Sequence, residues 1–259
     1  PSFYEEAATA ANIVINGANG VGSYSLADNY FKNFAADNQT SPEVIFAVAY
    51  KSGSSDLGTQ SQFKQSMHYN LPNPGGTPWN GFTTIANVYK SYATEPGPDG
   101  EMGTQDDVHN DTRGKSFLVG QQYTEPSVGC AGDDCYSDAS SDKVYMDDDE
   151  TIPLFHTLDI PKIRLGDVTE SEASSFGWPS TKETFRLDAP GARPLKFEID
   201  PSANNDFWGN DFPLFRLAEM YLIRAEAQQV SSEVSGDPIA TLNTLREKRE
   251  ASGADISLS

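Results

Sequence analysis

The side chains best suited to chemistry in this sequence are aromatic residues that stand in loops. Trp79 follows a turn-forming stretch of glycine, threonine and proline and precedes Asn80 and Gly81. Core packing is less expected in such a setting. An aromatic face stacks on the C–H face of a sugar ring, while nearby amide, carboxylate and guanidinium groups bond its hydroxyls. We therefore expect Trp79 and Asn80 to contact a ligand of this kind.

Several other aromatic side chains compete for the same role. Trp178 stands between a glycine and a proline, and Trp208 stands just ahead of a predicted helix, where capping the helix packing is the alternative. Tyr89 and Tyr92 have helical spacing, so we expect them in the core. The candidate ligand platforms are Tyr69, Trp79, Tyr89, Tyr92, Tyr123, Trp178 and Trp208. The predicted ligand set is Tyr69, Trp79, Asn80, Trp178 and Trp208.

An acidic loop at residues 99–107 combines oxygen donors with glycines, as a calcium site would. Its potential ligands are Asp99, Glu101, Asp106 and Asp107. Because their spacing does not follow the EF-hand pattern, we interpret the loop as a solvated turn, with calcium as the alternative. No other cofactor is expected. The acidic run at 147–150 is expected to face solvent.

The two cysteines, Cys130 and Cys135, enclose four residues of an Asp/Gly-rich loop. This spacing suits a small turn closed by a disulfide, which would indicate an oxidising, extracytoplasmic setting. Two free thiols and half of a metal site are the alternatives.

No catalytic pattern is found in the sequence. It contains no Gly-x-Ser-x-Gly elbow, no phosphate-cradling loop and no histidine spacing typical of a metal centre. His68, His109 and His156 lie in different loops, each without an obvious partner. Pairs of carboxylates mean little for glycoside hydrolysis in so acidic a chain. We expect a protein that is not an enzyme.

Apolar spacing predicts a few regular elements between these loops. Ser2 and Glu5 form a capping-box pattern ahead of a helix with one apolar face through residue 15. Further expected elements are a helix at 26–34, a buried strand at 43–50, a helix at 83–92 and short strands at 160–165 and 195–199.

The C-terminal part predicts a helical hairpin of tetratricopeptide type. The first helix is expected at 212–228, with small alanines that let a partner helix approach. Asp237 and Pro238 supply an N-cap and a first helical position, and Gly253 is expected as the C′ residue of the second helix. The apolar positions expected to be buried are Leu214, Leu217, Ala218, Tyr221, Leu222 and Ala225, then Ile239, Leu242 and Leu245. One hairpin cannot bury its own faces, so further helices must lie beside it.

Composition limits the partners. With 38 acidic and 18 basic side chains, the 259 residues carry a formal charge of −20. This charge disfavours nucleic acid and docking to anionic lipid, because both require basic side chains. No run of apolar residues is long enough for a membrane span. Both ends of the sequence look cut, so we expect a longer parent protein with a targeting segment upstream.

The hairpin sequences are RLAEMYLIRAEAQ (216–228) and ATLNTLREKREASG (240–253). They resemble the C-terminal repeat of the SusD/RagB family, outer-membrane lipoproteins of Bacteroidetes. Earlier blocks are similar to family segments in the same order, at 4–38, 41–50, 75–92 and 110–113. The ending at 250–253 is looser than the family's, and the family's lipid-bearing cysteine, N-terminal helices and final C-terminal segment are missing. The resemblance therefore indicates a fragment.

The resemblance implies a mainly α, SusD-like fold with tetratricopeptide-type hairpins, long ligand-bearing loops and a few short strands. We expect one incomplete domain, divided into 1–50 (helix, helix, strand), a ligand-binding region at 51–210 and the hairpin at 211–255. The implied function is non-catalytic binding of an oligosaccharide or polysaccharide at the cell surface. The implied partner is a TonB-dependent, SusC-like transporter, and the membrane is reached only through a lipid anchor N-terminal to this chain. A RagB-like peptide-binding protein and a structural interaction module are the alternatives. The ligand's identity and the oligomeric state stay open.

Overall fold

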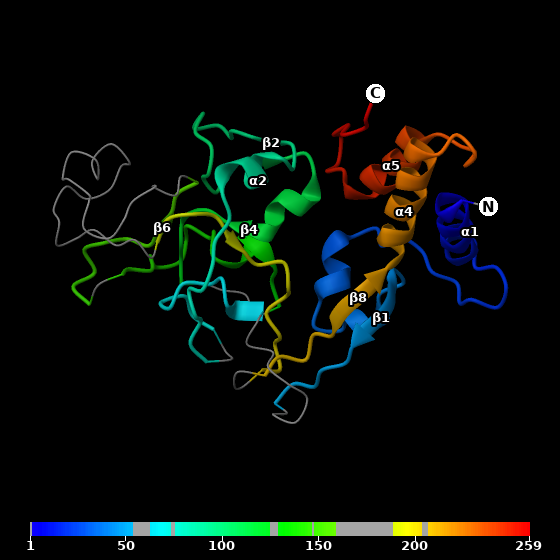
Figure 1. The fold of residues 1–259 in the computed structure, drawn as a ribbon. Helices are drawn as coiled ribbons and strands as arrows, with labels where there is room; N and C mark the ends of the chain where they lie inside the picture. Colours follow the sequence, from blue (N-terminus) through cyan, green and yellow to red (C-terminus); the bar gives the residue numbers. More distant parts are fainter. Residues whose placement is uncertain are drawn as a thin grey trace.

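The computed structural model describes residues 2–53, 63–73, 76–124, 129–146, 148–158, 189–203 and 207–259. Two regions can be distinguished (Figure 1). We call residues 2–50 and 211–259 the helical end, and the described residues from 63 to 210 the loop-rich region. None of the helices in the described ranges has the length and apolar composition that crossing a membrane requires.

The helical end contains the helices α1 (Phe3–Ile15), α4 (Leu217–Val230) and α5 (Pro238–Arg246). Helix α1 lies on the outer side of α4, and α5 packs on α4 from another direction (Figure 1). The α1 start is the predicted capping box: the Ser2 side chain accepts from the Glu5 N–H, and the Glu5 carboxylate accepts from the Ser2 N–H. Buried alanines on both α1 and α4 let these two helices approach closely.

The first helix of the hairpin begins later than predicted. Residues Phe212–Arg216 form strand β8, which pairs antiparallel with β1 (Val44–Val48). The aromatic residues of this segment favour a strand, and Pro213 is tolerated because the two-stranded sheet leaves each strand an unpaired edge. The expectation of a buried helical face through Leu214 is therefore wrong, and Leu222 on α4 is also exposed.

Helix α5 starts as predicted, with Asp237 as N-cap and Pro238 at the first position. It ends at Arg246, and a 3-10 helix, η7 (Glu247–Arg249), follows. Gly253 has a positive φ of 84° but closes a later turn, so its predicted role as the C′ residue is wrong. Ile239 is exposed, and Thr241 is the buried residue of this helix.

The shorter predicted elements are met in part. The strand at 43–50 exists as β1, but it is not buried, since Phe46 and Val48 are exposed. The helix predicted at 26–34 is the 3-10 helix η1 (Tyr30–Phe34), and the one at 83–92 shrinks to α2 (Ala86–Lys90). Residues 195–199 form no strand, and the chain bends at Phe197, so that strand prediction is wrong. The strand predicted at 160–165 lies outside the described residues.

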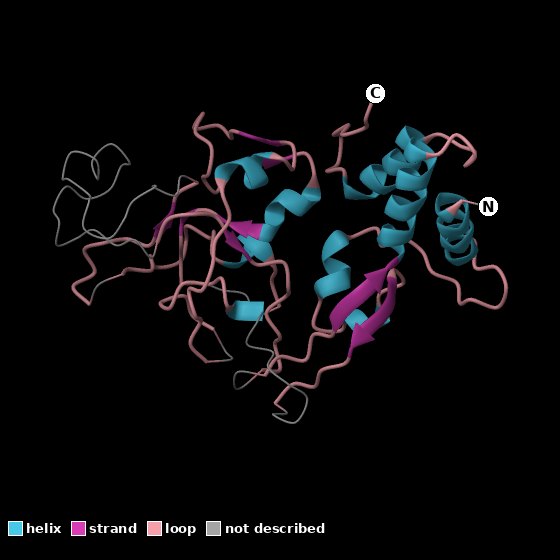
Figure 2. Cartoon of the chain, in the orientation of Figure 1, coloured by secondary structure: helices cyan, strands magenta, loops and turns pink. Residues whose placement is uncertain are grey.

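The loop-rich region is held together by short antiparallel pairs (Figure 2). They are β2 (Thr94–Glu95) with β3 (Val108–His109), β4 (Phe117–Leu118) with β7 (Arg193–Pro194), and β5 (Gly120–Gln121) with β6 (Phe155–His156). Three further 3-10 helices are η2 (Asn38–Thr40), η5 (Thr112–Ser116) and η6 (Gly132–Cys135). Most of the described chain is turn or loop, which corrects the expectation of a mainly α protein.

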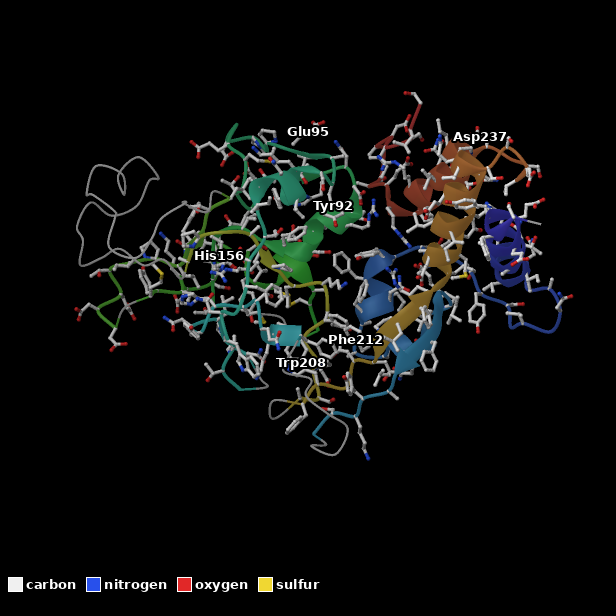
Figure 3. The ribbon with its side chains drawn as sticks, in the orientation of Figure 1. Tyr92, Glu95, His156, Trp208, Phe212 and Asp237 are labelled. Atoms are coloured by element: carbon white, nitrogen blue, oxygen red, sulfur yellow. A yellow bond between two sulfur atoms is a disulfide. The ribbon has the colours of Figure 1, made fainter. Side chains whose placement is uncertain are left out.

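The main hydrophobic core lies in this irregular region and at its junction with the helical end. Its wholly buried members include Trp208, Met67, Leu71 and Leu154. Trp208 and Phe212 lie where the two regions meet (Figure 3). The centroids of their rings lie 6.3 and 6.4 Å from the centroid of the Phe63 ring. The long loops are therefore ordered by a core of their own.

A buried ion cluster connects the N-terminal and C-terminal segments that make up the helical end. The Glu43 carboxylate, fully buried, accepts from Arg216 at 2.9 Å and from Arg249 at 2.8 Å. It also accepts from the Ala27 N–H at 3.0 Å. Burial alone would raise the pKa of Glu43, but Arg249, the Ala27 N–H and Arg216 outweigh burial and hold this pKa below its usual value. The carboxylate is thus ionised and joins β1, β8, η7 and the chain before η1.

Candidate functional site

Two predicted ligand residues, Tyr69 and Trp79, line one open surface pocket of about 630 Å³. Their side chains are 48% and 50% exposed, so both rings present large faces to solvent. Gly76, Thr77 and Pro78 complete the lining. None of these residues carries a charge. The sequence therefore identified a pair of aromatic side chains that the fold brings together from separate segments.

The pocket is built on two chain segments that run side by side. The Asn80 N–H donates to the Met67 carbonyl at 2.8 Å, and the Gly81 N–H donates to the Gln65 carbonyl at 2.5 Å. Met67 is fully buried in the core. The two bonds tie residues 80–81 to a segment anchored in the core. The side chains of Tyr69 and Trp79 therefore project from the same part of the surface.

Asn80 holds this junction in a strained conformation rather than lining the pocket. Its φ is +51°, in the left-handed region that asparagine tolerates better than most residues. A Cβ on the next residue, Gly81, would lie 3.2 Å from the Gln65 carbonyl oxygen. Asn80 is half-buried, and its predicted ligand contact becomes a positioning role through its backbone.

One of two neighbouring buried histidines, His68, lies against Tyr69, with ring centroids 5.5 Å apart. The rings of His68 and His156 are fully buried, with centroids 6.4 Å apart. His156 lies in β6, inside the loop-rich region (Figure 3). No local sequence pattern predicts this pair, because each histidine stands alone in its own loop and the association depends on tertiary packing.

The protonation of His156 follows from its surroundings. Burial, and then the positive charge of Arg193, lower its pKa to about 3, so the ring is neutral near pH 7. Its Nδ1 lies 2.6 Å from the Ala189 carbonyl oxygen. A carbonyl only accepts, so Nδ1 carries the proton and donates it to this bond. The histidine is fixed as a structural hydrogen-bond donor.

The third histidine also has partners, against the expectation that it stands alone. His109 Nδ1 lies 3.1 Å from the Thr94 hydroxyl, and its Nε2 lies 3.5 Å from the Asp133 carboxylate. Asp133 belongs to η6, so His109 connects β3 with the loop between the cysteines. All three groups are largely enclosed, and the set holds two loops together.

The remaining aromatic candidates do not join the pocket. Trp208 is fully buried in the core, so its predicted ligand contact is wrong; the indole packs near Phe63 at 6.3 Å. Tyr89 is buried as predicted, in a second, smaller core with Phe117, where its hydroxyl donates to Asp107 at 2.7 Å, and Tyr92 packs against this second core. Tyr123 is half-buried and bridges to Lys143 through its backbone. Trp178 lies outside the described residues.

The acidic loop at 99–107 uses its carboxylates for its own backbone. Asp99 accepts from the Glu101 N–H at 2.8 Å, and Asp106 accepts from the Asp99 N–H at 3.1 Å. Asp107 accepts from the Gly103 N–H at 2.7 Å as well as from Tyr89. Within the ranges that the structure describes, no three acidic, histidine or cysteine side chains converge as a metal site would require. The loop is a turn closed by side-chain acceptors.

The two cysteines are joined, with their Cα atoms 5.2 Å apart. The loop between them contains η6, and it rests directly on another segment. Gly132 has a φ of +64°, and a Cβ there would overlap the Lys115 carbonyl oxygen at 1.7 Å. Only glycine permits this approach. The disulfide loop is therefore fixed against η5.

Comparison with known proteins relates this geometry to a family. A model of the SusD family matches residues 42–253. Among solved structures, the chain is similar to surface glycan-binding protein A from Bacteroides thetaiotaomicron in complex with laminarihexaose, with a TM-score of 0.54 and 17% identity. The match covers 99% of this chain and 45% of that one.

Two further structures are similar in the same way. A SusD-like protein from Bacteroides fragilis gives a TM-score of 0.54 at 17% identity, covering 99% of this chain and 44% of its own. A SusD superfamily protein from Parabacteroides distasonis gives 0.51 at 14%, covering 99% and 40%. The chain thus spans less than half the length of these structures, and the likeness is one of fold. No curated protein was found to match the chain.

Proposed function

Since the chain belongs to the SusD family, a family of non-catalytic binding proteins, we propose that it binds a glycan at the cell surface through the Tyr69–Trp79 pocket. The observation that carries this proposal is the pair of half-exposed rings on one pocket whose described lining residues are uncharged. Two rings anchored to the core can stack on a sugar without reordering, which lowers the entropic cost of binding.

Charge supports a neutral glycan over an anionic one. Among the described residues that line the pocket there is no lysine or arginine to neutralise a uronic acid or a sulfate. The whole chain has a formal charge of −20, which repels anionic ligands at low ionic strength. A neutral oligosaccharide is bound by stacking and hydrogen bonds alone, which also permits release.

The exposure of these rings disfavours the interaction-module alternative, which would require the aromatic side chains to be buried. For the longer parent protein, we propose a lipid anchor upstream of this chain and delivery of the glycan to a TonB-dependent, SusC-like transporter. Family membership supports this part, as does the name of the surface glycan-binding protein to which the chain is similar. Co-isolation of the parent protein with such a transporter from its own cells would test it.

Isothermal titration tests the glycan proposal directly. The chain is titrated with neutral oligosaccharides, including laminarihexaose, with oligogalacturonate and with a peptide panel. Trp79→Ala should weaken binding of the neutral ligand at least about tenfold, as loss of a binding hot spot does. Phe215→Ala is the matched control, because Phe215 on β8 is also 50% exposed. Equal affinity of Trp79→Ala and wild type would remove the pocket from the proposal, and selective binding of peptides would favour a peptide-binding protein.

A further inference from the structure

A second pocket, of about 490 Å³, lies at the junction of the helical end and the loop-rich region. One wall comes from the chain around η1, and the other from the disulfide loop and residue 198. The described lining residues include Ala27, Asn29, Phe31, Cys130, Asp134 and Glu198. None of them belongs to the Tyr69–Trp79 pocket, so the two sites are separate.

Both walls of this junction pocket are fixed by bonds to the scaffold. The Glu198 N–H donates to the Phe34 carbonyl at 3.0 Å, which ties residue 198 to η1. The Ile199 N–H donates to the Cys130 carbonyl at 2.8 Å, and the disulfide closes the same loop. Ala27 is fastened on the other side by its N–H bond to the buried Glu43. The pocket is therefore formed before any ligand arrives.

The walls combine apolar surface with hydrogen-bonding groups in the proportions of a small-molecule site. Phe31 contributes an aromatic side chain, and the disulfide, the alanines and Pro42 contribute apolar surface. The amide of Asn29 and the carboxylates of Asp28, Asp134 and Glu198 also line the pocket, and the Asn29 Oδ1 accepts from the Phe31 N–H at 2.9 Å, which leaves its NH2 group to donate. A carboxylate accepts from sugar hydroxyls, an amide both donates and accepts, and a phenyl ring covers a C–H face.

The charges around the pocket exclude an anion. Lys32 is paired with Asp37 at 2.7 Å, Asp28 with Lys248 at 2.5 Å, and Asp134 with Lys115 at 3.5 Å. Glu198 accepts the Ala36 N–H at 2.6 Å and has no ion pair among the described side chains. Among the described lining residues, Lys32 is the one cationic side chain and is already paired, whereas the Glu198 carboxylate has no cationic partner.

We propose that the junction pocket is a second sugar-binding site, which takes a single neutral pyranose residue of the same glycan class. The proposal rests on the proposed function for its ligand class and adds a separate location. Phe31 stacks on the ring, and Glu198 and Asn29 bond its hydroxyls. A volume of about 490 Å³ lies within the range of small-ligand pockets and restricts the site to a short portion of a glycan.

Stoichiometry with short probes distinguishes the two sites. The intact chain is titrated with the neutral disaccharides laminaribiose, maltose and cellobiose, which are too short to bridge distant sites. Phe31→Ala should bind one disaccharide fewer than wild type, or bind it about tenfold more weakly at that site. Ala131→Trp, which fills the pocket from an extended backbone position, should have the same effect without truncating any contact. Phe155→Ala, at an exposed ring on β6, is the control.

Each outcome decides between the proposals. The second site is supported if Phe31→Ala and Ala131→Trp each bind one disaccharide fewer than wild type while binding at the Tyr69–Trp79 pocket is retained. Unchanged stoichiometry and affinity in both variants would overturn it and leave the Tyr69–Trp79 proposal standing. Unchanged binding in Trp79→Ala with a loss in Phe31→Ala would overturn the first site and keep the second. Absence of binding by every neutral disaccharide and by laminarihexaose would overturn both.

Discussion

The helical end and the loop-rich region differ in where they bury their largest side chains. The helical end has regular elements, yet it leaves large apolar side chains in solvent: Phe3 is 89% exposed, Phe46 55% and Leu222 52%. The loop-rich region has little regular structure, yet it encloses Trp208, Met67 and Leu154 completely. Regular backbone and complete packing are thus separate properties. The core that makes the chain rigid is the one under its loops.

Side-chain amides replace secondary structure in the loop-rich region and at its edge. Gln122 donates to the carbonyls of Val119 and Gly120, at 2.9 and 3.1 Å. Asn210 donates to the carbonyls of Phe34 and Glu198, both at 3.0 Å, and so ties η1 to the segment beside it. Buried carbonyls need donors, and these amides supply them where no ladder exists.

The largest difference in stability is expected between alanine variants of the two described tryptophans. Trp208→Ala removes a fully buried side chain and should lower the free energy of unfolding by about 3–5 kcal/mol, measured by urea denaturation. Trp79→Ala, at a half-exposed ring, should change it by less than about 0.5 kcal/mol while weakening glycan binding. A small loss in Trp208→Ala would contradict the assignment of the main core to the irregular region.

The next largest effect tests whether the buried ion cluster stabilises the helical end, where packing is incomplete. Glu43→Leu leaves Arg249 buried without its carboxylate and should lower the free energy of unfolding by about 3 kcal/mol. Glu226→Ala, at an exposed position on α4, is the matched control and should be nearly neutral. If the two variants unfold at the same urea concentration, the buried ion cluster is not what stabilises this end.

A smaller loss of stability is expected at low pH, through the buried His156 of the loop-rich region. The pKa of His156 is about 3 when folded, below its ordinary value near 6.5, so the unfolded state binds more protons between these values. Stability from the neutral ring is complete above pH 6.5 and declines as the pH falls toward 3. We expect a loss of about 2 kcal/mol between pH 6.5 and 5. The charged and titratable neighbours are Arg193 and His68.

The variant His156→Gln should flatten this part of the pH profile, since the amide keeps a donor but does not titrate. His109→Gln, whose ring is paired with Asp133, provides the comparison. An unchanged slope in His156→Gln would show that another group titrates in this window.

The smallest effect concerns the exposed sheet of the helical end. Phe46 and Phe215 stack across β1 and β8, with ring centroids 6.3 Å apart and an interplanar angle of 29°. A double-mutant cycle to alanine should give a coupling of about 0.5 kcal/mol, as expected for an exposed cross-strand pair. A coupling energy larger than the loss of stability in Glu43→Leu would contradict the proposed order, in which the buried ion cluster stabilises the helical end more than this ring pair does.

Local signals allowed much of the helical end to be predicted. The capping box at Ser2 and the pair Asp237–Pro238 mark helix starts that the structure contains. Strand β8 was missed because its partner β1 lies far away in the sequence, and the apolar spacing of 212–216 also continues into α4. The Tyr69–Trp79 pair was found because exposed aromatic residues in glycine- and proline-rich loops are a local signal.

The sequence could not have revealed groups whose proximity is created by the fold. His68 and His156, the three members of the Glu43 cluster and the two walls of the junction pocket come from distant segments. Trp208 was misassigned for the converse reason, because its flanking residues look like a loop while tertiary packing encloses the ring.

The Glu43 cluster also bears on the order in which the chain is made. Glu43 precedes Arg216 by 173 residues and Arg249 by 206, so it leaves the ribosome long before either partner. Until then the carboxylate stays in water, and β1 has no β8 to pair with. The main core, which includes both Phe34 and Trp208, is likewise incomplete until the segment just before β8 has been made. In this chain β1 is made long before it can be locked in place.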